Sequence, residues 1–372
     1  MVRPRGGATV GGSGTGTVTL TGSVAQIDAT LAAANDVHYQ GVFGFVGADH
    51  LTMTSNDGGG TGAGGVLTDT DVVAINVAST TRPPGFDAGN NGHDDILWYR
   101  DNGTVSIWDD GQINNGHFVA TGVPLNWHIV GQGDFDGNGQ HDILWYRDDG
   151  AVSIWDNGRI EGAHIVAGPG VVASSWHVAG TGDFDGNGQS DILWRNDDGA
   201  AWIWDNGQIG KAHIISGAGV VANSWHIAGT GDFDGNGQSD ILWRNDNGAA
   251  SIWDNGQINN AHIISAAGDV ANSWHIAGTG DFDGNGRSDI LWRNDNGAAS
   301  IWDNGQINNG HIISAAGVVG NDWHIADTGD YDGNGKTDIL WRRDSGAVSI
   351  WDNGQIDHAH VIATIPNDWH IV

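Results

Sequence analysis

Short apolar runs of three or four residues alternate with polar turns along most of the chain. The run Ile-Leu-Trp at 96–98 is followed by a polar turn, by a second run that ends in Ile-Trp-Asp, and by an Asp-Asp-Gly turn that becomes Asp-Asn-Gly in later copies. Runs this short predict strands, and no segment shows the 3.6-residue period of a helix. Asn-Gly between apolar runs favours tight hairpins, because type I′ turns need positive φ at both central residues. The pattern therefore predicts an all-β, antiparallel structure.

Three tryptophan motifs recur in order along the chain. The Ile-Trp-Asp motif repeats at a step of 47 and then 49 residues, and residues 224–258 and 273–307 differ only at Gln238 and Arg287. The Ile-Leu-Trp motif contains Trp98, Trp145, Trp194, Trp243, Trp292 and Trp341; the Ile-Trp-Asp motif contains Trp108, Trp155, Trp204, Trp253, Trp302 and Trp351; the Trp-His motif contains Trp127, Trp176, Trp225, Trp274, Trp323 and Trp369. Only Trp202 lies outside these series. Internal repeats of this length are typical of propellers and solenoids.

The three series do not start together. The first repeat has no Trp-His motif before its Ile-Leu-Trp, and the missing copy stands at the end of the chain in Trp369–Val372. Four short strands per repeat, repeated six times, predict a six-bladed β-propeller. We expect the ring to close by sharing one blade between the two termini, so that Trp369–Val372 pairs with the strand at Ile96–Trp98.

A loop of sequence Asp-Phe-Asp-Gly-Asn-Gly-x-x-Asp precedes the Ile-Leu-Trp strand in five repeats, with Tyr331 in place of Phe in the last. Side-chain oxygens at positions 1, 3, 5 and 9, a Gly at 6 and a main-chain carbonyl at 7 are the donors of a calcium loop. An ordinary Asp-, Asn- and Gly-rich surface turn is the alternative. Five copies in register favour calcium (Ca²⁺), at about five sites.

At positions 1, 3, 5, 7 and 9, the candidate ligands are Asp134, Asp136, Asn138, Gln140 and Asp142; Asp183, Asp185, Asn187, Gln189 and Asp191; Asp232, Asp234, Asn236, Gln238 and Asp240; Asp281, Asp283, Asn285, Arg287 and Asp289; and Asp330, Asp332, Asn334, Lys336 and Asp338. The residues at position 7 are expected to bind through their main-chain carbonyls. The first repeat keeps Asp87, Asn91 and Asp95 but has Gly89 at position 3. We expect weak or absent binding in this degraded loop.

The charge of the chain is strongly unbalanced, with 45 acidic residues against 14 basic ones and a formal net charge of −31. All the acids except Glu161 are Asp, whose short side chain suits tight loops and metal ligation. A protein without a basic face is not expected to bind nucleic acid. The chain has no cysteine, which excludes disulfides and thiolate chemistry.

No stretch approaches the roughly 18 consecutive apolar residues of a membrane helix, so we expect no membrane insertion. Residues 1–7 contain no apolar core that would serve as a secretory signal. A secreted protein without disulfides needs other stabilisation, and bound calcium is the obvious candidate. We therefore expect a fragment of a longer secreted protein, located outside the cell or at the cell surface.

The string Asp-Phe-Asp-Gly-Asn-Gly-x-x-Asp-Ile-Leu-Trp-Arg-Asn resembles the repeat core of the FG-GAP/VCBS family of calcium-binding β-propellers. The resemblance covers roughly residues 82–372. It implies a propeller fold over the expected domain 81–372, and it implies that the Asp and Asn residues of the loops are calcium ligands.

Residues 1–80 differ from the repeats and are rich in Gly, Thr, Val and Ala. Alternating Thr and Val at 17–31, 51–59 and 67–77, with Asn-Asp-Gly turns, predicts strands of a partial β-sandwich. This region resembles the later strands of the cadherin-like (Ig-like) tandem domains of bacterial surface adhesins. Residues 78–85 are expected to form a linker.

The repeats favour adhesion or recognition over catalysis, because an enzyme needs one asymmetric set of reacting groups. The expected partner is a surface polysaccharide or a protein, bound by several blades at once. A glycan-binding lectin propeller and a purely structural spacer are the alternatives. Trp253 and Trp302 are candidates for sugar contact, although the tryptophans equally suit packing between blades.

Histidines recur in the Trp-His motif and in a second series. The second series consists of His117, His164, His213, His262, His311 and His360. We expect both series to make hydrogen bonds between blades, and a His-lined metal or acid–base centre at the ring axis is the alternative.

Overall fold

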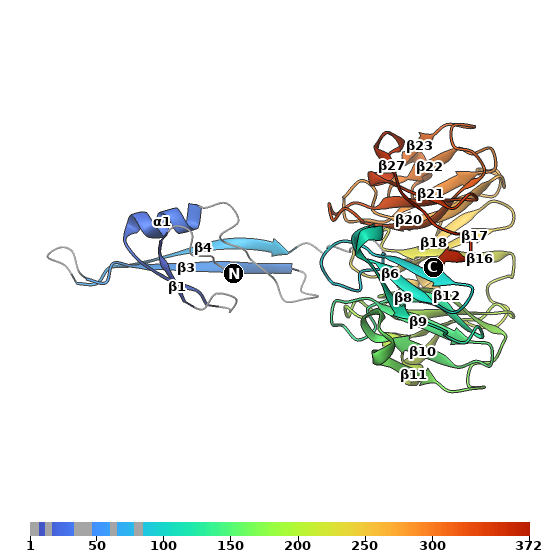
Figure 1. The fold of residues 1–372 in the computed structure, drawn as a ribbon, viewed down its shortest axis with the longest axis horizontal. Helices are drawn as coiled ribbons and strands as arrows, with labels where there is room; N and C mark the ends of the chain where they lie inside the picture. The colour runs from blue at the N-terminus through green and yellow to red at the C-terminus, as the bar shows by residue number, and fades with distance from the viewer. Residues whose placement is uncertain (1–6, 12–16, 33–46, 60–64, 78–84) are drawn as a thin grey trace. The chain divides into compact units, whose positions relative to one another are not determined.

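The computed structural model describes residues 7–11, 17–32, 47–59, 65–77 and 85–372 (Figure 1). The chain divides into two compact units, Met1–Ala78 and Ser79–Val372. The expected linker lies almost entirely outside the described residues. In the part of the chain that the structure describes, no helix has the length and apolar character needed to cross a membrane.

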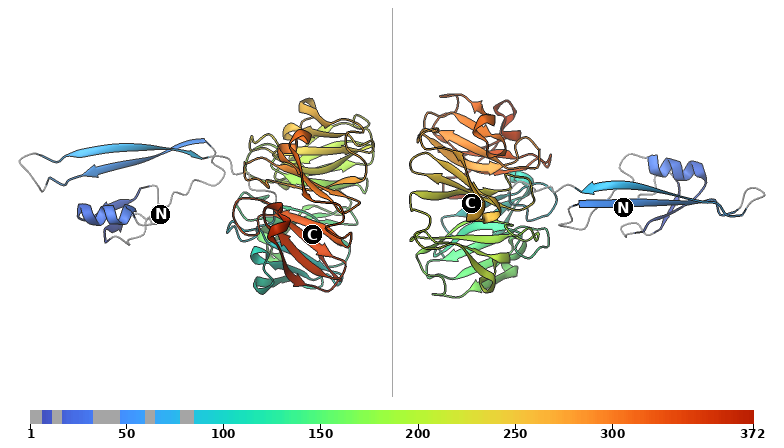
Figure 2. Two further views of the ribbon diagram at one scale, coloured as in Figure 1. Left: turned by 90° about the horizontal axis from the view of Figure 1, so that it is seen from above. Right: turned by 180° about the vertical axis from the view of Figure 1, so that it is seen from behind.

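Residues 85–372 form six antiparallel sheets of four strands each, which are the blades of a six-bladed β-propeller. The colours of the blades pass from cyan through green and yellow to red in Figures 1 and 2. Two short 3-10 turns, such as η3 (Asp156–Gly158) and η4 (Ile160–Gly162), join the third strand of each blade to the fourth. The predicted all-β propeller is confirmed.

The first three blades contain, in spatial order, β28 (Trp369–Ile371), β5 (Ile96–Arg100), β6 (Val105–Trp108) and β7 (Gly116–Ala120) in blade 1; β8 (Trp127–Gly133), β9 (Asp142–Arg147), β10 (Val152–Trp155) and β11 (Ala163–Ala167) in blade 2; and β12 (Trp176–Gly182), β13 (Asp191–Asn196), β14 (Ala201–Trp204) and β15 (Ala212–Ser216) in blade 3.

The other three contain β16 (Trp225–Gly231), β17 (Asp240–Asn245), β18 (Ala250–Trp253) and β19 (Ala261–Ser265) in blade 4; β20 (Trp274–Gly280), β21 (Asp289–Asn294), β22 (Ala299–Trp302) and β23 (Gly310–Ser314) in blade 5; and β24 (Trp323–Gly329), β25 (Asp338–Arg343), β26 (Ala347–Trp351) and β27 (Ala359–Thr364) in blade 6.

The C-terminal strand β28 completes blade 1, as the sequence predicts. It pairs antiparallel with β5, with Trp369 opposite Arg100 and Ile371 opposite Trp98. The pairing continues beyond the strand, because Val372 N–H donates to Leu97 O at 3.1 Å. The last strand therefore closes the ring by the same pairing that β8 and β9 use within blade 2.

The core lies between neighbouring blades and is built around pairs of tryptophans. The Ile-Leu-Trp indoles are 1% exposed, and each packs on the Ile-Trp-Asp indole of its own blade, as Trp243 does on Trp253 with ring centroids 4.7 Å apart. These rings meet Phe184 and Ile203 of the preceding blade in one cluster. Burial of such large apolar surfaces stabilises the contact of blade against blade.

The unit Met1–Ala78 contains two small sheets and one helix among its described residues. The elements are β1 (Thr9–Gly11) paired with β2 (Thr19–Thr21), β3 (Gly47–Asn56) paired with β4 (Thr68–Val77), and α1 (Val24–Ala32). The strands expected at 51–59 and 67–77 agree with the β3–β4 hairpin. The β-sandwich and the cadherin-like character stay predictions.

The strand expected over residues 24–31 is wrong, because α1 occupies this stretch. The helix begins with a capping box, in which Gln26 N–H donates to Ser23 Oγ at 3.4 Å and Ser23 N–H donates to Gln26 Oε1 at 2.9 Å. A Ser-x-x-Gln pair of this kind satisfies two N–H groups that a helix start leaves free. This local signal outweighs the Thr and Val alternation.

Candidate metal centre

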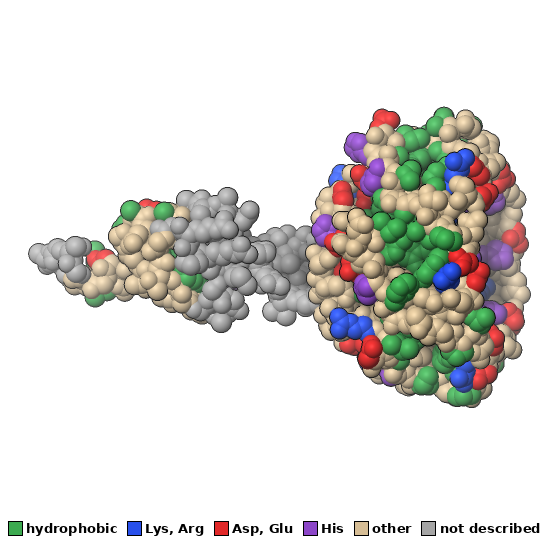
Figure 3. All heavy atoms as spheres, viewed as in Figure 1, with side chains coloured by type: hydrophobic (Ala, Val, Ile, Leu, Met, Phe, Trp, Pro, Cys, Tyr) green, Lys and Arg blue, Asp and Glu red, His purple; other side chains and the backbone are tan. Residues whose placement is uncertain are grey.

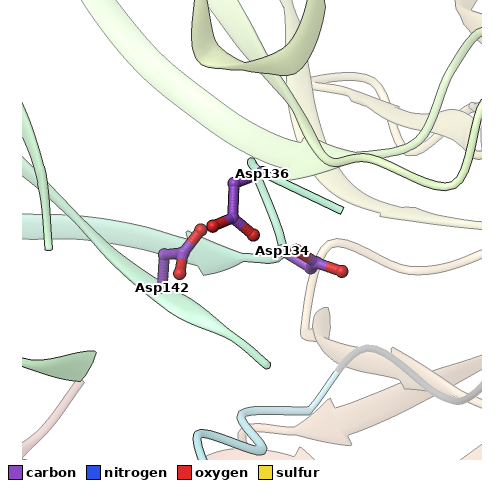
Figure 4. A group of neighbouring side chains, drawn as sticks. All are labelled: Asp134, Asp136 and Asp142. Carbon is purple, nitrogen blue, oxygen red and sulfur yellow. The ribbon is translucent and has the colours of Figure 1, made fainter. Parts of the chain in front are cut away.

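Five loops join the first strand of a blade to the second, in blades 2 to 6, and each gathers three aspartates. Within each group, ligand atoms of the three carboxylates lie within 4.8 Å of one another. The groups are Asp134, Asp136 and Asp142; Asp183, Asp185 and Asp191; Asp232, Asp234 and Asp240; Asp281, Asp283 and Asp289; and Asp330, Asp332 and Asp338. Figure 4 shows the first group, in which the carboxylates of Asp136 and Asp142 are turned toward each other.

Hydrogen bonds inside the loop hold its first two carboxylates in place. The Asp134 carboxylate accepts from the N–H groups of Gly137 at 2.8 Å, Asn138 at 3.1 Å and Gly139 at 2.8 Å. The same Asn138 N–H also donates a hydrogen bond to Asp136 Oδ1 at 3.0 Å. Gly137 and Gly139 have φ of +77° and +87°, a backbone conformation that glycine adopts without strain. The glycines of the motif therefore serve to wrap the loop around its own carboxylates.

The aspartate at position 9 is the buried member of the group. Asp142 has no exposed surface, and its oxygens accept from Phe135 N–H at 2.9 Å and Asn157 N–H at 2.7 Å. Burial, together with repulsion from Asp136 and Asp156, raises the pKa of Asp142 to about 7. Burial also raises the pKa to about 7 at Asp191, Asp240, Asp289 and Asp338.

This donor set fits a hard divalent cation. Carboxylate, amide and carbonyl oxygens are the ligands that calcium prefers. Buried carboxylates that repel one another are stabilised most by a positive charge among them. The main-chain carbonyls expected to act at position 7 stay a prediction.

A turn elsewhere in the blade supports each loop, and sequence reasoning missed it. Asn157 follows the Ile-Trp-Asp motif with φ of 55°, and its side-chain Oδ1 accepts from Asn138 Nδ2 at 2.8 Å while its N–H binds Asp142. The equivalent residues in blades 3 to 6 are Asn206, Asn255, Asn304 and Asn353. Their constant spacing of 19 residues from the loop Asn was the available signal.

A model of the FG-GAP-like repeat matches residues 134–194, 183–243, 232–292 and 281–341, which together span more than half of the chain. The chain belongs to the FG-GAP-like repeat family. We call the five nine-residue loops that begin at Asp134, Asp183, Asp232, Asp281 and Asp330 the candidate metal loops, or metal loops for short. Each matched segment begins at position 1 of one of these loops and ends at the Ile-Leu-Trp tryptophan of the next blade. The FG-GAP-like repeat thus contains the loop together with the buried strand that follows it.

No curated protein matches this FG-GAP-like chain. Among solved structures, YCF48 bound to a D1 peptide is 14% identical with a TM-score of 0.42, over 77% of this chain and 82% of that one. Raptor from Chaetomium thermophilum is 15% identical with a TM-score of 0.46, over 76% of this chain and 24% of that one. A BBS1N structure in complex with ARL6DN is 12% identical with a TM-score of 0.41, over 76% and 83%.

The loop of blade 1 keeps the framework of the FG-GAP-like loops without their full donor set. Asp87 accepts from Asn91 N–H at 3.4 Å and Gly92 N–H at 3.1 Å, and Asp95 accepts from Ala88 N–H at 2.9 Å. Position 3 is Gly89, so the loop offers two carboxylates where the others offer three. The weak or absent binding expected here stays a prediction.

The tryptophans divide into two buried series and one half-buried series. Trp253 and Trp302 are 5% and 7% exposed and pack on Trp243 and Trp292, so the geometry favours packing between blades for these two rings. Their contact with a sugar stays a prediction. The Trp-His indoles, in contrast, are half-buried in all six blades.

Apolar surface collects beside the half-buried tryptophans. A cavity of about 300 Å³ in blade 2 is lined by Trp127, Trp155, Ser153 and Ile165, among others. In blade 3 the odd tryptophan, Trp202, takes the place of this serine and packs edge-on against the Trp-His ring 5.6 Å away. Figure 3 shows hydrophobic side chains gathered on the drawn face of the propeller, with acidic and histidine side chains around them.

The recurring histidines are exposed and pair with aspartates of their own blade. His226 Nε2 lies 2.8 Å from Asp246 Oδ1, and His262 Nδ1 lies 3.4 Å from Asp254 Oδ1. Both series repeat these pairings in all six blades. The prediction that these imidazoles make hydrogen bonds between blades is therefore wrong, because each aspartate partner lies on a turn of the same sheet as its histidine.

Proposed function

We propose that this FG-GAP-like propeller is a calcium-binding recognition module of an extracellular or cell-surface protein. The observation that carries the proposal is the fivefold repetition of one carboxylate cluster at equivalent places in the ring. A propeller of FG-GAP-like repeats is a typical non-catalytic binding fold, so we assign it no enzymatic activity. The cadherin-like interpretation of residues 1–80 agrees with a surface protein.

Calcium would be held by the aspartates at positions 1, 3 and 9, by the loop Asn and by the main-chain carbonyl at position 7. When bound, the ion supplies positive charge among carboxylates that otherwise repel one another. Five divalent ions would offset about a third of the net charge of −31. We expect affinities of roughly 10⁻⁴–10⁻³ M, as in other extracellular modules.

The recognition surface that we propose is the repeated outer part of the blades. The fourth strand of every blade exposes one large apolar side chain. The Trp-His indole of the same blade is half-buried. These exposed residues are Phe118, Ile165, Ile214, Ile263, Ile312 and Val361. Because the blades present nearly the same surface, a ligand with its own repeat can meet several of them and gain avidity.

The proposed ligand is a surface polysaccharide or a protein. A glycan is favoured by the surface aromatic pair of Phe118 with Trp369, whose rings stack with centroids 6.3 Å apart. Aromatic faces stack on the apolar faces of sugars, and neighbouring Asn and Asp side chains supply hydrogen bonds. A lectin is therefore the second candidate function, and a structural spacer is the third.

Retention on a glycan array, measured in calcium and again in EGTA, tests this function. We expect retention in calcium that is lost in EGTA. Trp225→Ala and Trp274→Ala should weaken it, because these indoles have an accessible face. His226→Ala, on the same strand, is the matched control and should retain the glycan. A folded, calcium-loaded protein that binds neither glycans nor proteins from a surface extract would favour the spacer.

A further inference from the structure

Neighbouring metal loops are joined by main-chain hydrogen bonds that run around the whole ring. In each bond, the N–H at position 8 of one loop donates to the carbonyl at position 1 of the loop in the preceding blade. The six bonds are Ser190 to Asp134, Ser239 to Asp183 and Ser288 to Asp232 at 2.6 Å, and Thr337 to Asp281, Asp94 to Asp330 and His141 to Asp87 at 2.8 Å. The circle is closed, because it returns to the loop of blade 2 through the degraded loop of blade 1.

Side chains add a second link between the same loops. Ser288 Oγ accepts from Asp232 N–H at 3.0 Å, so the two residues exchange a pair of hydrogen bonds. Ser288 is 6% exposed, and Asp232 is 4% exposed. Gln189, at position 7 of its loop, donates through Nε2 to Asp136 O at 3.0 Å. Buried, paired hydrogen bonds of this kind fix the two loops relative to each other.

The linked atoms belong to the segments that carry the metal ligands. Position 1 supplies a carboxylate to its own site, and position 8 of the next loop lies between the ligand positions 7 and 9 of the next site. An ion that orders one loop therefore also orders ligands of its neighbour. The second ion then binds a loop whose ordering cost is already reduced, which is the condition for positive cooperativity.

We propose that calcium binds cooperatively around the ring, with each loop coupled to the loops of the two adjacent blades. This inference rests on the proposed calcium binding. The loop of blade 1 lacks the third carboxylate but keeps its main-chain hydrogen bonds to the loops of blades 6 and 2. It therefore connects these two loops mechanically. The sites of blades 3, 4 and 5 have two metal-binding neighbours, and those of blades 2 and 6 have one.

Calcium titration of the whole chain by calorimetry tests the proposal. We expect five ions and a Hill coefficient above one. Asp234→Asn removes a ligand in blade 4 and should cost one ion. The sites of the adjacent blades 3 and 5 should then bind roughly five-fold more weakly, at the lower end of typical coupling. Asp332→Asn in blade 6 is the matched control. It also removes one ion, but it should weaken the others less, because its loop has one metal-binding neighbour.

A second variant tests the link without touching a ligand. Ser288→Ala should leave five ions bound and lower the Hill coefficient, whereas Ser251→Ala, a buried serine of blade 4 outside the circle, should leave both unchanged. Five ions with a Hill coefficient of one, and full affinity at the remaining sites of Asp234→Asn, would overturn the coupling and leave calcium binding intact. A chain that binds no calcium would overturn both.

Discussion

A buried carboxylate at position 9 of each loop should make the stability of the folded protein depend on pH. Bound calcium should weaken this dependence. The folded pKa of Asp240 is raised to about 7 from an ordinary value of 3.8. The folded state therefore keeps a proton that the unfolded state releases, and metal-free stability should fall as pH rises from about 4 through 7. Bound calcium should reduce this loss, because it stabilises the ionised carboxylates.

Melting temperatures at pH 5 and pH 7.5, in EGTA and in calcium, check this expectation. We expect the EGTA sample to melt lower at pH 7.5, and the calcium sample to show a smaller decrease or none. A metal-free protein that becomes more stable over this interval would contradict the burial of ionised carboxylates in the loops.

Substitution of the buried tryptophans separates packing from ligand contact. Trp253→Ala and Trp302→Ala should each cost about 3–5 kcal/mol of unfolding free energy, since they leave large cavities between blades. Denaturant unfolding measures the cost, and the half-buried Trp225→Ala and Trp274→Ala are the controls that should cost less. A stable Trp253→Ala, Trp302→Ala double variant that loses its ligand would instead favour the contact role.

The candidate metal ligands and the residues that support them were predictable to different degrees. The aspartates at positions 1, 3 and 9 lie together because a nine-residue loop with glycines can only wrap tightly. Asn157 was not predicted, since its role depends on a left-handed turn in a distant part of the repeat. The exposed pairing of the histidines depends on the registry of neighbouring strands, which the motif alone does not specify.

Strand β28 is the element on which closure of the ring depends. Deletion of residues 366–372 removes its pairing with β5 and the 2.8 Å contact of Arg100 Nε with Asp368 Oδ2. The exposed edge of β5 would then be free to pair with other chains, so we expect a lower melting temperature and aggregation visible by light scattering. Asp368→Asn is the control and should have little effect, because the ion pair is exposed.

A truncated protein as soluble and stable as the full chain would show that the ring closes without β28. Strand β28 was predictable because the first repeat lacks a Trp-His motif and the end of the chain carries an additional one. Helix α1, in contrast, belongs to a segment with no second copy for comparison. Its capping box at Ser23 and Gln26 stabilises the helix start, but the alternation of Thr and Val around these residues predicted a strand.

At the scale of the whole molecule, repetition explains why the architecture was predictable and the ligand was not. Three tryptophan series in register specify six equivalent blades, and burial of two of those series ties each blade to the next. The same repetition gives the chain several similar surfaces and leaves the chemistry of the ligand open. It also concentrates negative charge in five loops, which makes calcium the central element of the account.

Comparison of the melting temperature in calcium and in EGTA is the most direct test of the proposed calcium binding. If binding is confined to the folded state, 10 mM calcium at the expected affinities contributes about 1.4–2.7 kcal/mol of stability per site. Five such sites should raise the melting temperature clearly, and EGTA should reverse the increase. An identical melting temperature in calcium and in EGTA would contradict a structural role for the metal.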